Sequence, residues 1–135
     1  MEFTDDVLSV LTDISKRKLR WAILAIDEND DSKVSVEASG EYTKDDCAGD
    51  FEKFNAAIPT DKCRWLIFDL EFMLNDVAVS KCVLAKYILM DSKQKEKFPY
   101  AQHTDALKAK MPHCAKLLME DDKADIKFDR WCGEF

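Results

Sequence analysis

Glycine and proline, the residues that most often interrupt helices and strands, are scarce in this sequence of 135 residues, which has only three of each. That scarcity excludes a collagenous or loop-dominated chain. The five cysteines are scattered and contain no CxxC pair, so we expect free thiols in a reducing compartment rather than a disulfide framework. A chain of this length suits one compact domain over residues 1–135 that buries a substantial core.

Signals for export or membrane insertion are also missing. No run of about 18 apolar residues occurs, so no transmembrane segment is expected. The N-terminus carries Glu2, Asp5 and Asp6, whereas a signal peptide begins with basic residues. These features predict a cytoplasmic protein.

Positive charge is in deficit overall, with a formal net charge of -7. The resulting field repels nucleic acid and anionic lipid, so we expect no general binding to either. Lysines are nevertheless concentrated between Lys93 and Lys116. A local basic patch in that region would suit docking to an acidic protein, or it would only keep an ordinary surface helix soluble.

Catalytic and metal-binding motifs are absent. The sequence contains no GxGxxG, GxxxxGK[ST], GxSxG or HExxH pattern. His103 and His113 lie too far apart in sequence, with too few further ligands, to predict a metal site. A nucleophilic pair of Cys114 and His113 stays open as an alternative, although packed or surface residues explain both. Little in the sequence therefore looks catalytic and no metal site is expected, and we interpret Asp69 and Glu71 as solvent-facing or structural.

Hydrophobic periodicity predicts a mixed α/β fold. Alternating or continuous apolar runs indicate strands, and apolar residues three or four positions apart indicate helices. Thr43 with Asp46 resembles a capping box for the second helix. The expected helices span 3–18, 43–59, 95–111 and 123–135, and the expected strands span 20–27, 33–38, 63–72, 79–90 and 113–120. This order predicts a central mixed sheet of about five strands sandwiched between helices, with a loop over 73–78.

The segment 95–111 has helical spacing but contains a proline. Tyr100, Thr104, Leu107 and Met111 form one stripe, which predicts a face packed on the sheet. Pro99 removes a backbone donor and crowds the preceding turn. The helix therefore either starts near Phe98 or bends at Pro99, and we favour the bend.

Two segments resemble the actin-depolymerising factor (ADF)/cofilin family. "CRWLIFDLEF" (63–72) is similar to that family's "CRYAVYDFEY" strand, and "YAQHTDALKAKM" (100–111) is similar to its "YASSKDALKKKL" helix. Upstream, "RWAILAIDENDDSKVSVEA" resembles the family's first hairpin. The likeness extends over roughly residues 4–130 and keeps the order and separation of the motifs.

The resemblance implies a monomeric cytoplasmic and cytoskeletal protein that binds actin monomers and filament sides and promotes filament disassembly. It implies no cofactor and no enzymatic activity, and it suggests that phosphoinositides compete for the same lysines. Carried over by position, the actin-binding residues are Lys95 and Lys97 at the helix start and Lys108 and Lys110 along the helix. An ordinary histidine gains a proton at about pH 6.5. An exposed His103 would then add a positive charge at the contact and strengthen binding at low pH.

Departures from the family pattern point to weaker filament binding. The hairpin "MLNDVAVS" has no basic residue before Lys81, whereas the family uses a basic loop there to contact filaments. A separate departure is that "MEFTDD" lacks the family's N-terminal Ser-Gly, which often carries an inhibitory phosphate, so we do not expect that switch here. Both departures would suit the glia-maturation-factor branch, which shares the fold but binds the branch-nucleating complex, so that branch stays open as an alternative.

Overall fold

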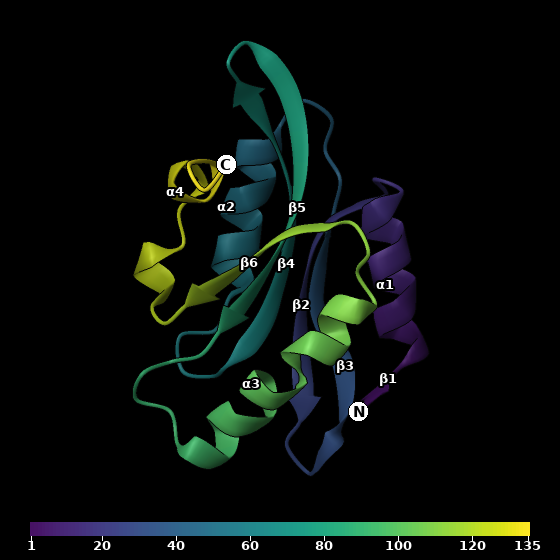
Figure 1. Cartoon of the computed structure of the whole chain (residues 1–135), viewed down its shortest axis with the longest axis vertical. Coiled ribbons are helices and arrows are strands. Elements are labelled where there is room, and N and C mark those ends of the chain that lie inside the picture. Colours follow the sequence, from purple (N-terminus) through teal and green to yellow (C-terminus); the bar gives the residue numbers. More distant parts are fainter.

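The computed structural model, which describes residues 1–135, is built on one mixed sheet (Figure 1). Its strands lie in the order β1-β3-β2-β4-β5-β6. Neighbouring strands are antiparallel except for the outer pairs β1–β3 and β5–β6, which are parallel. The bounds are β1 Glu2–Phe3, β2 Leu19–Asp27, β3 Asp30–Glu41, β4 Arg64–Leu74, β5 Val77–Tyr87 and β6 Cys114–Glu120. The mixed α/β sheet predicted from the sequence is confirmed, with six strands in place of about five.

Two helices cover each face of the sheet (Figure 1). Helices α1 (Asp5–Ser15) and α3 (Gln94–Ala109) pack on one face, and α2 (Cys47–Ala57) and α4 (Phe128–Cys132) on the other. The period-two alternation of β4 separates two buried clusters, because successive side chains point to opposite faces. Trp65 and Ile67 lie under α1 and α3, whereas Leu66, Phe68 and Leu70 lie under α2 and α4.

The hairpin of β4 and β5 extends beyond the helices (Figure 1). Its strands run further than predicted and leave only Asn75 and Asp76 as the turn, so the expected loop over 73–78 was too long. Both turn residues have positive φ, 51° and 65°, as a tight two-residue hairpin requires. Because β4 and β5 are paired up to this turn, the strands set the direction in which the hairpin tip points.

Other boundaries also differ from the prediction. The second helix begins at Cys47, with Asp46 as its N-cap accepting a hydrogen bond from the Gly49 N–H at 3.1 Å, so a capping box at Thr43 was wrong. Strand β3 begins at Asp30 rather than at residue 33, and it runs to Glu41 rather than to residue 38. The last predicted helix is divided into η1 (Lys123–Asp125) and α4.

Gly40 is required by its neighbour across the sheet. It pairs with Trp21 in the β2–β3 ladder, and a Cβ atom there would lie 2.0 Å from the indole Nε1. The indole thus lies over the strand backbone and closes that end of the core. No helix is long enough and apolar enough to cross a membrane.

Candidate functional site

Helix α3 is fixed to the sheet by the stripe predicted from its spacing. Tyr100, Thr104, Leu107 and Met111 are all buried. The indole Nε1 of Trp65 donates a hydrogen bond to the Thr104 hydroxyl at 3.2 Å, and the Trp65 and Tyr100 rings meet edge to face at 5.1 Å. The opposite side of α3 is consequently presented to solvent in one orientation.

The Tyr100 hydroxyl links α3 to the central strands. It accepts the backbone N–H of Ile26 at 2.9 Å and a guanidinium N–H of Arg64 at 3.4 Å. Burial raises the pKa of Tyr100, so the group acts as a neutral hydroxyl.

Replacing Tyr100 by Phe is expected to lower the free energy of unfolding by about 1–3 kcal/mol, because the buried Ile26 N–H loses its acceptor while the ring packing stays. Urea unfolding monitored by circular dichroism measures the change. A loss below about 0.5 kcal/mol, typical of surface substitutions, would show that this hydrogen bond does not hold the helix.

Two contacts define the start of α3. The Glu96 carboxylate accepts the Cys63 N–H at 2.8 Å, and the Lys97 ammonium donates to the Met90 carbonyl at 2.6 Å. The helix begins at Gln94 and continues through Pro99, so a start near Phe98 was wrong. A bend at Pro99 stays a prediction. It is expected because proline has no backbone N–H, so one hydrogen bond of the helix is missing there.

The predicted binding residues fall in different surroundings. Lys95 and Lys108 are exposed, and no side-chain carboxylate of the chain pairs with either. They lie about 140° apart around the helix axis, since 13 residues separate them at about 100° per residue, so both can flank one exposed side. Lys97 is held by its contact with Met90 and His103 is half-buried. Lys110 is the exposed C-cap residue, beyond the last helical turn.

The solvent side of α3, called here the exposed α3 face, contains an aromatic residue that the sequence analysis missed. Phe98 is 54% exposed. The signal was available, because Phe98 precedes Tyr100 by two positions and such residues do not share a helical face. The exposed α3 face comprises Lys95, Phe98, Gln102, Asp105 and Lys108.

The tip of the β4–β5 hairpin is apolar and open. Met73 is 64% exposed and Val77 is 60% exposed. No lysine or arginine lies between Arg64 and Lys81. This tip, residues 73–78, therefore offers a hydrophobic contact instead of a basic one.

A buried guanidinium organises the base of that hairpin. Arg20 is fully buried and donates to Asp50 at 2.9 Å, to Glu71 at 2.6 Å and to the carbonyls of Asp69 at 3.1 Å and Thr43 at 2.9 Å. Burial alone would raise the pKa of Asp50, but hydrogen bonds from the Thr43 N–H and Arg20 hold it below its usual value. Glu71 therefore has a structural role, which was one of the two interpretations, solvent-facing or structural, that the sequence suggested.

Comparison with known proteins identifies the family. The family model for cofilin/tropomyosin-type actin-binding proteins matches residues 1–132. The chain belongs to the ADF/cofilin family. Members of this family bind actin and are not enzymes, so the alternative of a Cys114–His113 nucleophile has no support.

Curated and solved relatives agree with this assignment. An actin-depolymerizing factor of Brassica napus is 29% identical over 118 residues, covering 87% of each chain. The crystal structure of Streptomyces griseoflavus cofilin superposes with a TM-score of 0.82 at 21% identity, covering 98% of this ADF/cofilin chain and 95% of the other. The glia maturation factor of Caenorhabditis elegans has a TM-score of 0.76 at 17% identity, covering 99% and 93%. The ADF-homology fold is thus common to both branches.

Proposed function

We propose that this protein binds actin monomers through the exposed α3 face and promotes filament turnover, acting as a cytoplasmic, cytoskeletal monomer without a cofactor. The observation that carries the proposal is the orientation of α3. Its buried stripe fixes the opposite side, where Phe98, Lys95 and Lys108 are all exposed. An open aromatic residue with cationic neighbours is typical of a protein-binding surface.

Charge and apolar contact have different parts in this binding. Actin is acidic, so Lys95, Lys97, Lys108 and Lys110 provide local attraction on a chain whose net charge is -7. Such pairs direct orientation and association rate more than affinity. Phosphoinositides, which carry several phosphates, would compete for the same lysines, and a vesicle containing them should then reduce actin binding.

Replacing both Lys108 and Lys110 by Ala should weaken monomer binding at least tenfold, since each charge-assisted contact contributes about 1.5–3 kcal/mol. Titration of fluorescent actin monomers measures the change. Lys33→Ala with Lys53→Ala removes the same charge from exposed positions away from α3 and is the matched control. Equal losses in both double variants would show that only net charge matters.

His103 is half-buried and lies outside the exposed α3 face as defined above, and we propose it as a fifth, peripheral contact. Binding is expected to be stronger at about pH 6 than at about pH 8, because a histidine carries more positive charge at the lower pH. The difference should vanish in His103→Gln. A pH dependence that survives this substitution would assign the effect to another group.

Filament binding is expected to be weak, because the hairpin tip lacks cations. Co-sedimentation with filaments, compared with monomer titration of the same sample, tests this expectation. Tight co-sedimentation that resists high salt would instead mean that Met73 and Val77 make an apolar filament contact, since salt screens charge but not apolar burial.

The apolar hairpin tip also favours a second candidate, a glia-maturation-factor-like protein that binds the branch-nucleating complex. The shared fold permits it. Capture of that complex on the immobilised protein in the absence of actin, combined with no binding of actin monomers, would favour this candidate over the first.

A further inference from the structure

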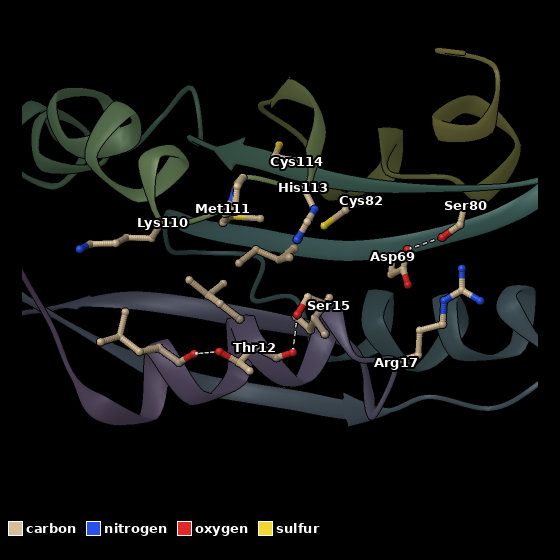
Figure 2. Close-up of a pocket in the computed structure, with 15 residues that line it drawn as sticks. Thr12, Ser15, Arg17, Asp69, Ser80, Cys82, Lys110, Met111, His113 and Cys114 are labelled. Atoms are coloured by element: carbon tan, nitrogen blue, oxygen red, sulfur yellow. Dashed lines mark hydrogen bonds between the residues drawn. The ribbon is translucent and has the colours of Figure 1, made fainter.

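A cavity lies between α1 and the turn that joins α3 to β6, away from the exposed α3 face (Figure 2). Its volume is about 480 Å³, within the range of about 300–1,000 Å³ that is common for small-molecule sites. Leu8, Leu11 and Ile14 of α1 form one wall, and Met111 forms part of the other. The cavity is therefore large and apolar enough to hold an organic molecule.

One carboxylate closes the inner end of this cavity. Asp69 is only 6% exposed, and Ser80 donates a hydrogen bond to its Oδ1 at 3.0 Å. No donor of the chain reaches Oδ2, and no lysine, arginine or histidine pairs with the carboxylate. In Figure 2 the second oxygen points away from Ser80, toward the α1 side.

The free oxygen of Asp69 is open to the cavity, since the only buried side-chain polar atom without a hydrogen-bond partner is the Thr4 hydroxyl. A carboxylate that is mostly taken out of water gains from a directly bonded cation. Burial raises the pKa of Asp69, although the hydrogen bond from Ser80 and the nearby charges of Arg20 and Arg17 act in the opposite direction. A cation brought into the cavity would supply the missing partner.

We propose that this cavity, called here the α1 cavity, binds a small organic amine with an apolar body. The ammonium group donates to the free oxygen of Asp69, and the hydrocarbon part packs against Leu11, Ile14 and Ile67. The net charge of -7 attracts cations to the protein.

The rim of the cavity restricts the ligand to a single positive charge. Arg17, Lys110 and His113 also line the cavity, and the imidazole of His113 is directed inward (Figure 2). A second ammonium group, as in a polyamine, would be repelled there. An anionic amphiphile placed with its acid group inward would meet the carboxylate of Asp69. A monoamine avoids both conflicts.

The test compares 2-phenylethylamine with 2-phenylethanol, which has a similar shape and no charge. Isothermal titration calorimetry should give about tenfold tighter binding of the amine, because charge-assisted hydrogen bonds are stronger than neutral ones. Two-dimensional NMR of the labelled protein should show shifts at amides that line the cavity, such as those of Ile14 and Cys82.

Two variants make the result specific. Asp69→Asn keeps the shape and the contact with Ser80, and it should abolish the preference for the amine, whereas Asp31→Asn at an exposed position of β3 should leave it unchanged. Thr12→Trp, at an exposed position on the rim, should block both probes. Should Asp69→Asn fail to fold, the wild-type preference and the Thr12→Trp block decide. Equal affinity for amine and alcohol in the wild type, or a preference that persists in Asp69→Asn, would overturn the proposal.

Discussion

Replacing Arg20 by Ala is expected to lower the free energy of unfolding by about 3–5 kcal/mol, the largest stability loss expected from removing one charge in this fold. The substitution leaves the buried carboxylate of Asp50 and the half-buried one of Glu71 without their cation. It also removes the donor to the Thr43 carbonyl and the guanidinium that lies 3.9 Å from the centre of the Tyr42 ring. Urea unfolding followed by tryptophan fluorescence measures the effect.

The double variant Arg20→Met with Asp50→Asn separates lost pairing from lost packing. Because it removes both charges of the buried pair, it should lose less stability than the sum of the two single variants. Lys33→Ala at an exposed position should change stability by less than about 0.5 kcal/mol. Strict additivity of the two single losses would contradict a direct interaction between Arg20 and Asp50.

Acid should remove the stabilisation that the ion pairs of Arg20 with Asp50 and Glu71 provide. Partial burial would raise the pKa of Glu71, but hydrogen bonds from Tyr42 and Arg20 lower it. The pKa of Asp50 is also lowered, despite its burial, by hydrogen bonds from Thr43 and Arg20. A carboxyl whose pKa is lower in the folded state stabilises the fold above its unfolded value of about 4, and this contribution is lost as the pH falls through the folded value. Unfolding measured over a pH series should therefore converge for wild type and Arg20→Ala in acid.

The sheet and the packing of α3 could be predicted because the spacing of apolar residues along each segment shows both. The buried residues Tyr100, Thr104, Leu107 and Met111 follow directly from their spacing. Strand β1 could not be predicted in this way, because Glu2 and Phe3 are too few residues to show alternation. It is extended only because Lys33 and Val34 lie beside it.

The charged network was beyond sequence reasoning for a different reason. Arg20 opens the apolar run of β2 and looks like an ordinary strand start, whereas its partners Asp50 and Glu71 come from α2 and β4. The unpaired state of Asp69 is equally non-local, since it depends on which cations fail to reach it. Phe98, in contrast, was overlooked although its position relative to Tyr100 already placed it on the solvent side.

Replacing Phe98 by Ala is expected to weaken actin-monomer binding by about thirtyfold or more, because aromatic anchors at the centre of an interface typically contribute at least about 2 kcal/mol. The side chain is already 54% exposed in the free protein, so the fold should lose little stability. Fluorescent actin titration, with thermal unfolding of the same sample, measures both quantities.

Met119→Ala is the matched control, because Met119 is also an exposed apolar residue but lies on β6. If Phe98 were only a solvent-facing residue, both variants would bind actin like the wild type, and the lysines alone would have to explain the affinity. That alternative predicts steep weakening by salt. A binding surface centred on Phe98 predicts instead that much of the affinity survives at high ionic strength and disappears with the ring.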